Sequence, residues 1–367
     1  MQIDFANLKI QHNLYKEEIE EAILKVARDC NFIMGSQIDE LERNLEKFTG
    51  SKYAISCSSG TDALLLAMMA LDIQPDDEII TTPFTFFATA ETIAFLKAKP
   101  VFVDIDEKTY NIDPKKIEEK ITSKTKAIMP VSLYGQPCDM DEINQIAKKY
   151  NLKVIVDGAQ SFGSTYKGIS DSNLGDISCT SFFPAKPLGC YGDGGALFTN
   201  DEKLADKIKS LRLHGQSIRY HHQYIGMGGR LDTIQAAVLN VKLKYYPKDL
   251  KLRQDVAAKY TQALNAKNIE TPFVKNDRTS AWAQYSIRVQ NRTELQTKLQ
   301  NLGIPTAVHY PMPLHVQECF KYLNLKEGDF PISEKVSKEI MSLPMNPYVT
   351  DEEIEFIVGS LAKELKC

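Results

Sequence analysis

Short apolar runs alternate with longer amphipathic segments along the N-terminal half of the chain. The apolar runs have the length of strands, and the segments between them place apolar residues at helical spacing. We predict strands at residues 52–56, 77–82, 99–105, 126–133 and 153–157, and helices at residues 61–71, 89–97, 114–121 and 140–150. Regular alternation of this kind is typical of βαβ units and a largely parallel sheet.

Two further apolar runs, at residues 176–183 and 194–200, follow each other with no helical segment between them. Because parallel neighbours need a long crossover connection, we expect at least one of these strands to pair antiparallel. The pattern therefore predicts the α/β class, with a mostly parallel but mixed sheet.

The second half of the chain has a different pattern. A predicted helix at residues 201–212 leads into a polar and aromatic loop, HGQSIRYHHQYIGMGGR. Two helical patterns follow, at residues 231–246 and 248–266, and the second is long and amphipathic. A C-terminal segment of mixed α and β pattern completes the chain. We predict a large domain at residues 1–245 and a smaller α+β domain at residues 246–367.

Composition narrows the class of protein. The 367 residues are 43% hydrophobic and 25% charged, which is typical of a soluble globular protein. A net charge of −4 and the lack of a basic block argue against a nucleic-acid partner. Acidic residues near the start and an apolar run of no more than Ala63 to Leu71 predict neither a signal peptide nor a membrane span. We therefore expect a cytoplasmic protein.

Cysteine usage predicts neither disulfides nor a metal site. Seven cysteines are scattered between Cys30 and Cys367, with an odd count and no CxxC pair. Cys179 falls inside a predicted strand and Cys57 directly follows one, and at such places a free cysteine usually behaves as a small buried apolar residue.

Four loops combine polar residues with the ends of predicted strands, where ligands collect in open α/β sheets. In CSSGTDAL, the sequence from Ser58 to Thr61 leads directly into a helix, whose free N–H groups can bind an anion. The same residues are equally suited to a simple helix cap. In VIVDGAQSFG, Asp157 ends a buried strand, and a carboxylate there needs a cation or several donors. A turn aspartate is the alternative, and Gln160 could reach the same ligand.

The other two loops add an aromatic face and an amine. In TPFTFFATAE, Phe86 or Phe87 offers a flat ring near a strand end, although most such rings belong to the core. In CTSFFPAKPLG, Lys186 stands between an aromatic run and a glycine-rich stretch, and Ser181 precedes it by five residues. A phosphate cradle, an aspartate for a ring nitrogen, a stacking ring and a lysine together match the requirements of pyridoxal phosphate.

The chain resembles the DegT/DnrJ/EryC1/StrS family of nucleotide-sugar aminotransferases over nearly its whole length. The resemblance rests on GTDAL, FTFFATAE, PVFVDID, VSLYGQ, VDGAQSFG, SFFPAKPLGCYGDGGA, RYHH, GGRLDTIQAA and AVHYPMPL. It implies the fold type I of pyridoxal-phosphate enzymes, like aspartate aminotransferase. It also implies a homodimer with two active sites at the interface.

The resemblance assigns cofactor roles to seven residues. Lys186 would form the Schiff base and shuttle protons, and Asp157 would hold the pyridinium nitrogen. Gln160 would contact the ring oxygen, and Phe86 would stack on the ring. The phosphate would be bound by Gly60, Thr61 and Ser181. No residue is assigned to a metal.

Three further positions match residues near the substrate: Arg230, His309 and Tyr310. Arg230 is a candidate for capturing a carboxylate with its bidentate fork. The chain departs from the family in one place, because the family usually has an asparagine where Gly228 stands. That asparagine reaches the phosphate in the neighbouring subunit, and Gly228 has no side chain to make this contact. Arg219 and His221 could meet a nucleotide phosphate or a uronate, or be solvated loop charges.

Within the family, the stretch from residue 214 to the following helix most resembles enzymes that aminate C3 of a sugar. The expected reaction transfers the amino group of L-glutamate to a UDP-linked 3-keto-2-acetamido uronic sugar. The alternatives are 3-keto UDP-N-acetylglucosamine, on the route to a diamino lipid A, and a dTDP-linked 3-keto-6-deoxyhexose. A non-catalytic cofactor-binding regulator and a dehydratase are rivals, although Lys186 argues against the family's dehydratases, which have histidine there.

Overall fold

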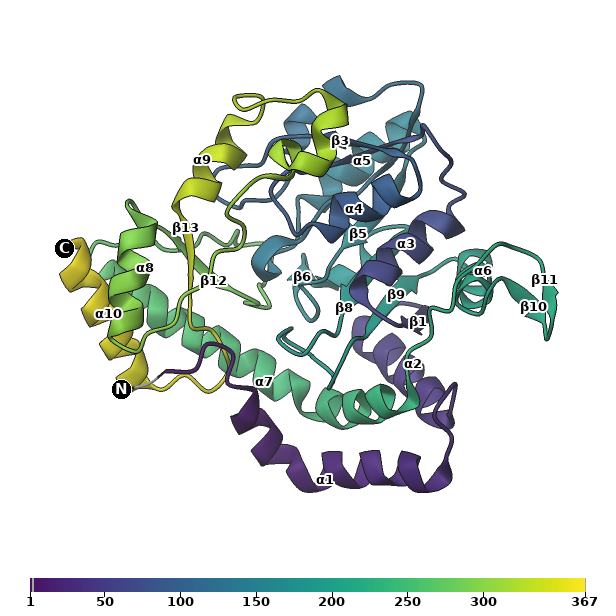
Figure 1. Cartoon of the computed structure of the whole chain (residues 1–367), viewed down its shortest axis with the longest axis horizontal. Coiled ribbons are helices and arrows are strands. Elements are labelled where there is room, and N and C mark those ends of the chain that lie inside the picture. Colours follow the sequence, from purple (N-terminus) through teal and green to yellow (C-terminus); the bar gives the residue numbers. More distant parts are fainter. Residues whose placement is uncertain (2, 367) are drawn as a thin grey trace.

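The computed structural model describes residues 1 and 3–366, and its centre is a seven-stranded sheet (Figure 1). The strands lie in the order β1 (Tyr53–Cys57), β9 (Gly195–Thr199), β8 (Ile177–Ser181), β5 (Lys153–Asp157), β4 (Thr125–Ile128), β2 (Glu78–Thr81) and β3 (Lys99–Phe102). Strand β9 is antiparallel to both of its neighbours, and the other pairs from β8 to β3 are parallel. The mixed, mostly parallel sheet and the antiparallel pairing of 176–183 with 194–200 are thus confirmed.

Helices cover both faces of this sheet because successive strand residues point to opposite sides. In β1, Ile55 packs with the cluster that includes α3 (Gly60–Ala70) and α6 (Glu202–Arg212). Its neighbour Ala54 packs with the cluster that includes α2 (Ser36–Thr49) and α7 (Thr233–Asn265). Residues of strand β5 alternate in the same way. Ile155 packs on the first face, and Val156 packs on the second, beside α5 (Met140–Tyr150). Strands buried on both faces explain their nearly continuous apolar sequence.

Three predicted helices differ in the structure. Residues 114–121 form two 3₁₀ turns, Pro114–Lys116 and Glu118–Lys120, in place of an α-helix. Only Ile117 of this short segment is fully buried, so little packing energy supports a longer helix. The helices predicted at 231–246 and 248–266 are one helix, α7, with Pro247 inside it. Its flanking residues Tyr246 and Asp249 are buried, and this packing carries the helix through the proline.

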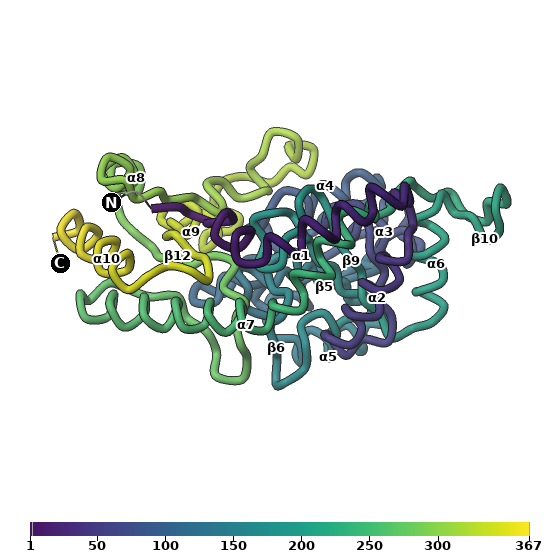
Figure 2. The backbone as a smooth tube through the Cα atoms, turned by 90° about the horizontal axis from the view of Figure 1, so that it is seen from below, coloured from purple at the N-terminus to yellow at the C-terminus, as the bar shows by residue number. Residues whose placement is uncertain are grey.

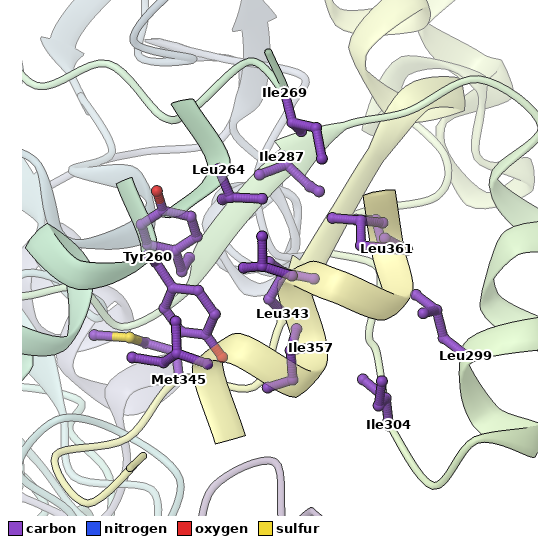
Figure 3. Close-up of a cluster of buried hydrophobic side chains, with 14 of the residues drawn as sticks. Tyr260, Leu264, Ile269, Ile287, Leu299, Ile304, Leu343, Met345, Ile357 and Leu361 are labelled. Carbon is purple, nitrogen blue, oxygen red and sulfur yellow. The ribbon is translucent and has the colours of Figure 1, made fainter. Parts of the chain in front are cut away.

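A separate apolar cluster forms among the C-terminal elements (Figure 3). It brings Tyr260 and Leu264 from the end of α7 against Ile287, Leu343 and Ile357. These last three come from β12 (Tyr285–Arg288), β13 (Ile340–Leu343) and α10 (Asp351–Leu365), and α8 (Arg292–Asn301) adds further members. Helix α7 therefore serves two cores, and Ile3 near the N-terminus joins the C-terminal one.

The domain boundary predicted near residue 246 lies inside this shared helix. Residues of α7 up to Tyr246 pack with the sheet cluster, and those from Val256 onward pack with the C-terminal cluster. We retain the division into residues 1–245 and 246–367 as a proposal.

The remaining elements surround these two cores. Helix α1 (Leu8–Asp29) lies along α7, and α4 (Ala88–Phe95) and α9 (Pro331–Glu339) flank the strands nearest β3 (Figure 1). The polar loop after α6 contains a small hairpin, β10 (Gln216–Ile218) and β11 (His221–His222), which projects from the molecule at the end opposite the chain termini (Figure 2). The short elements are β6 (Thr165–Tyr166), β7 (Ile169–Ser170) and the 3₁₀ turns Leu133–Gly135, Asp171–Asn173, Leu314–Val316 and Glu318–Leu323.

The predicted burial of two cysteines is confirmed. Cys57 and Cys179 are buried in β1 and β8, as predicted, whereas Cys367 lies outside the described residues. Among the described residues, no helix is both long and apolar enough to cross a bilayer.

Candidate active site

The carboxyl ends of β5 and β8 meet at one edge of the sheet, because the two strands are parallel neighbours. Asp157 is the last residue of β5, and its side chain is buried. Its Oδ2 accepts a hydrogen bond from the Thr89 hydroxyl at 2.7 Å, and its Oδ1 accepts one from the Ala159 backbone N–H at 3.2 Å. Burial raises the pKa of this carboxyl, while the hydrogen bonds from Thr89 and Ala159 lower it. A buried carboxylate in this setting is suited to pairing with a cation.

The amine of Lys186 is the charged group that acts on Asp157. Burial lowers the pKa of Lys186, and the nearby Asp157 carboxylate partly opposes this shift. The loop that carries Lys186 begins at the end of β8, and its first turn closes through a bond from the Lys186 N–H to the Phe183 carbonyl at 2.8 Å. A lysine with a lowered pKa has more of its free amine at neutral pH, which is the form that acts as a nucleophile or base.

Residues 309 and 310 come from the C-terminal half of the chain and face the same place. Burial lowers the pKa of His309 to about 4, and the Lys186 ammonium adds to the shift, so the imidazole is neutral at pH 7. Its Nδ1 lies 2.9 Å from the Ser342 hydroxyl. The hydroxyl of Tyr310 accepts a hydrogen bond from Gln160 Nε2 at 3.0 Å. The sheet edge and the C-terminal segment therefore meet at these side chains.

Of the two candidate aromatic residues, Phe86 belongs to this site. Its ring centroid lies 5.9 Å from that of Tyr310, and 54% of the residue is exposed. Phe87 instead packs against Phe320, with ring centroids 5.7 Å apart, in an apolar cluster that includes residues of α4. An exposed ring beside polar groups is free to cover a planar ligand.

The predicted phosphate cradle is formed where α3 begins. Ser59 caps the helix by accepting a hydrogen bond from the Asp62 N–H at 3.0 Å, which leaves the N–H groups of Gly60 and Thr61 at the open end of the helix. A Cβ added to Gly60 would lie 2.6 Å from the Cβ of Ser181, so this close approach requires glycine. The start of α3 and the end of β8 together present N–H groups and a hydroxyl.

Arg230 lies beside this cradle. The carbonyl of the preceding residue, Gly229, accepts a hydrogen bond from the Ser58 N–H at 3.0 Å. A Cβ added to Gly228 would lie 3.1 Å from His214 Cε1 and 3.8 Å from an Arg230 guanidinium nitrogen. The predicted residues thus form two adjoining groups, one around Asp157 and Lys186 and one around Gly60 and Ser181, with Arg230 at the edge of the second.

A family model described as the DegT/DnrJ/EryC1/StrS aminotransferase family matches residues 13–362. The chain belongs to this family. It is 50% identical over 98% of its length to the UDP-2-acetamido-2-deoxy-3-oxo-D-glucuronate aminotransferase of Pseudomonas aeruginosa, of which 99% is covered. It is also 43% identical over 99% of its length to a pleiotropic regulatory protein of Geobacillus stearothermophilus, of which 98% is covered.

Solved structures agree with the fold of this DegT/DnrJ/EryC1/StrS chain. The structure of NtdA from Bacillus subtilis, solved with bound cofactor PMP, superposes with a TM-score of 0.92 at 32% identity, covering 100% of this chain and 86% of that one. The DegT/DnrJ/EryC1/StrS aminotransferase from Brucella abortus superposes with a TM-score of 0.95 at 38% identity, covering 99% of both chains. The fold is therefore that of the fold type I enzymes, as the resemblance implied.

Three residues that contact the candidate site of this chain were not predicted from its sequence. Thr89 donates to Asp157, the Tyr134 N–H donates to Gln160 Oε1 at 2.7 Å, and the Ser342 hydroxyl contacts the His309 ring. Thr89 stood inside a motif that was singled out for its phenylalanines, so its hydroxyl was an available signal. Tyr134 stood inside the motif VSLYGQ, but its contact is made by the backbone N–H, which no residue type signals. Ser342 lay in none of the motifs that carried the resemblance.

The arrangement fits pyridoxal phosphate on three counts. The buried Asp157 carboxylate suits a protonated ring nitrogen, and the amine of Lys186 beside it suits an aldehyde. The close approach of Gly60 to Ser181 brings the N–H groups at the start of α3 and the Ser181 hydroxyl together, and such donors suit a phosphate. The residues present therefore supply a partner for each functional group of the cofactor.

Proposed function

We propose that this chain is a pyridoxal-phosphate-dependent transaminase that moves the amino group of L-glutamate to C3 of a UDP-linked 3-keto-2-acetamido uronic sugar. The product is a UDP-2,3-diamino sugar for a surface polysaccharide. The observation that carries the proposal is the buried Asp157 carboxylate at the end of β5, which lies close enough to the Lys186 amine that each group shifts the pKa of the other. The choice of sugar rests on the 50% identity to an enzyme named for that substrate class.

The cofactor would be held by residues of both groups. Asp157 would pair with its ring nitrogen, Gln160 with its ring oxygen, and Phe86 would cover its face. The N–H groups of Gly60 and Thr61, with the Ser181 hydroxyl, would bind its phosphate. When bound, pyridoxal phosphate supplies a carrier for the amino group and a ring that withdraws electrons.

Lys186 Nζ moves the protons of the reaction. In the first half, the free amine takes the proton from Cα of L-glutamate, and 2-oxoglutarate is released. Lys186 would pass this proton to the cofactor carbon that carries the amino group, and so become a free amine again. In the second half, the amine would take the proton back from that carbon and deliver it to C3 of the sugar. A base works best when its pKa is near the working pH, and burial lowers the pKa of Lys186 in that direction.

Three further residues orient the substrates. His309 is neutral at pH 7, because its pKa is about 4, so it can hydrogen-bond without adding a second positive charge near Lys186. Tyr310, held by Gln160, lies on the same side. Arg230 would grip a carboxylate of glutamate or of the uronic sugar with its two-pronged guanidinium.

We also propose a cytoplasmic homodimer in which each subunit completes the active site of the other. Large apolar side chains that are exposed in the single chain support this arrangement. They include Phe86 in the site, Ile218 and Tyr220 in the projecting hairpin, and Leu14 on α1. Burial of such residues in a second copy would remove apolar surface from water.

A second candidate is a cofactor-binding regulator, which is favoured by the 43% identity to a pleiotropic regulatory protein. Such a protein would bind pyridoxal phosphate without turning over glutamate. The net charge of −4 gives it no general attraction for nucleic acid, so the transaminase remains the leading proposal.

The test is to record the absorbance of the purified protein, add L-glutamate, and then add UDP-linked and dTDP-linked 3-keto sugars in turn. Bleaching of the cofactor band by glutamate, with release of 2-oxoglutarate, is expected, and the sugar that restores the band is the acceptor. A UDP-uronic sugar is the expected acceptor, whereas a UDP-hexose or a dTDP-6-deoxyhexose would correct the substrate. Cofactor that glutamate leaves unchanged would favour the regulator.

The Lys186→Ala variant tests the role of Lys186 in the reaction. It should keep the fold and bind the cofactor without a covalent bond. Its turnover should fall by at least about a hundredfold, because the group that moves the protons is missing. Near-normal transamination by this variant would show that Lys186 has been assigned wrongly.

A further inference from the structure

The main chain that follows Lys186 is tied to helix α7 by two side chains. The Nζ of Lys242 donates a hydrogen bond to the carbonyl of Gly189. Gln235 bonds both backbone polar groups of Tyr191. Its Oε1 accepts a hydrogen bond from the Tyr191 N–H at 2.8 Å, and its Nε2 donates one to the Tyr191 carbonyl at 3.3 Å. Gln235 and Lys242 are seven residues apart, so they lie on one face of α7 about two turns from each other.

The loop that carries Lys186 is narrow, so a displacement at Gly189 is passed on to its first turn. The loop is closed at its base by a bond from the Cys190 N–H to the Phe182 carbonyl at 2.8 Å. A Cβ added to Gly189 would lie only 2.4 Å from the Pro184 carbonyl oxygen. Residues on the two sides of Lys186 are therefore in direct contact.

Lys242 is an unusual choice for a purely structural contact. Only 4% of the residue is exposed, and burial lowers the pKa of its amine to about 8. Burying an amine carries a large desolvation cost that an apolar side chain in the middle of α7 would avoid. The amine lies 5.6 Å from the centre of the Tyr191 ring, so it contacts the same loop at two residues.

We propose that Lys242 and Gln235 are positioning residues that clamp the main chain of residues 189–191 to α7 and thereby hold the Lys186 amine beside Asp157. The proposal rests on the proposed function for the task of Lys186. It adds two residues to the reaction that contact neither the cofactor nor the substrate. It also links α7, which serves both cores, to the loop that carries the reacting amine, through the main chain of residues 189–191.

The test measures the amine of Lys186 itself. The full-length chain without cofactor is labelled with a trace of acetic anhydride across a range of pH, and mass spectrometry of the peptide that contains Lys186 gives its pKa. In the wild-type chain, burial holds this pKa below the ordinary value, against the raising effect of Asp157. In Lys242→Met and in Gln235→Leu, a released loop should let the amine reach water, and the pKa should rise by about one unit.

The two variants separate position from charge. Lys242→Met removes a cation and a donor, whereas Gln235→Leu removes hydrogen bonds and leaves the charge unchanged. A rise in both variants supports the clamp. A rise in Lys242→Met alone, or an unchanged Lys186 pKa in both, overturns it. If Lys242→Met does not fold, Gln235→Leu decides the question alone.

A matched control and a kinetic measurement complete the test. Lys244→Met alters an exposed lysine on the same helix, which is paired with Glu18 on the surface, and should leave the Lys186 pKa unchanged. In the two clamp variants, kcat should fall about tenfold or more with little change in KM, because the substrate contacts remain. If the wild-type chain does not convert L-glutamate to 2-oxoglutarate, the proposed function fails, while the labelling comparison still shows whether the clamp exists.

Discussion

Gln160 donates a hydrogen bond from its Nε2 to the hydroxyl of Tyr310, 3.0 Å away, and so joins the edge of the sheet to the C-terminal segment. Gln160 is buried, and its Oε1 is already bound to the Tyr134 N–H at 2.7 Å. The side chain therefore cannot turn to find another partner without breaking its second bond. One amide thus connects residues on both sides of the site.

Replacing Tyr310 by phenylalanine should test this connection. The change keeps the ring that contacts Phe86 but leaves the buried Gln160 amide without its acceptor. We expect the free energy of unfolding to fall by about 1–3 kcal/mol, measured by chemical denaturation. Tyr322→Phe, at an exposed tyrosine, is the control and should have no effect on stability. Equal stability of Tyr310→Phe and wild type would show that water replaces the hydroxyl.

Removing the hydroxyl of Thr89 should change the titration of Asp157. The hydrogen bond from Thr89 lowers the pKa of the Asp157 carboxyl, so Thr89→Val should raise that pKa. Because activity requires the carboxylate, the acid limb of the kcat/KM profile should move to higher pH by about one unit. Thr92→Val is the control, since this buried hydroxyl donates to the Ala88 carbonyl of its own helix at 2.9 Å. If the acid limb does not move, the Thr89 hydroxyl does not lower the pKa of Asp157.

The partly buried His309 should make the cofactor-free chain less stable in acid. Its pKa is about 4 in the folded chain against 6.5 in the unfolded one, so the unfolded state binds more protons between these values. The contribution of His309 is fully present above pH 6.5 and is lost as the pH falls toward 4, by at most about 3 kcal/mol. Thermal unfolding across this range should show a shallower slope for His309→Gln. An identical slope in both proteins would mean that the imidazole is protonated in the fold.

The close approach of Gly60 to Ser181 should make Gly60→Ala costly. The added methyl would lie 2.6 Å from the Ser181 Cβ, so the start of α3 must move away from the end of β8. We expect a loss of about 1–3 kcal/mol of stability together with weaker cofactor binding, measured by equilibrium dialysis. The double change Gly60→Ala with Ser181→Gly should recover much of the stability, because the clashing Cβ is gone. It should not recover the affinity, since the Ser181 hydroxyl is also lost.

Much of the sheet could be predicted because its signals are local. Each parallel strand is a short apolar run, and the missing helix between residues 183 and 194 was enough to predict an antiparallel pair. The loops around Asp157 and Lys186 could be found because polar residues at strand ends are conspicuous in an apolar sequence. The chemistry of the loops together indicated one common ligand, and the family resemblance then assigned a role to each residue.

The two helix errors have one physical reason. Local pattern favoured an α-helix at residues 114–121 and a break at Pro247, but tertiary packing decided both cases. The first segment buries too little surface to be held as an α-helix. The second has buried residues on both sides of the proline, so the helix continues between the two cores.

The sequence alone determined the class of fold and the alternation of strands and helices in the first half of the chain, and it predicted the residues that suit the cofactor. Only the tertiary structure decided which hydroxyl reaches Asp157, how Gln160 meets Tyr310, and that Lys242 holds the loop of Lys186. Burial, which lowers the pKa values of Lys186 and His309, was also decided there. Periodicity reports neighbours along one element, whereas these contacts join residues far apart in the chain, and the desolvation that shifts a pKa depends on everything packed around the group.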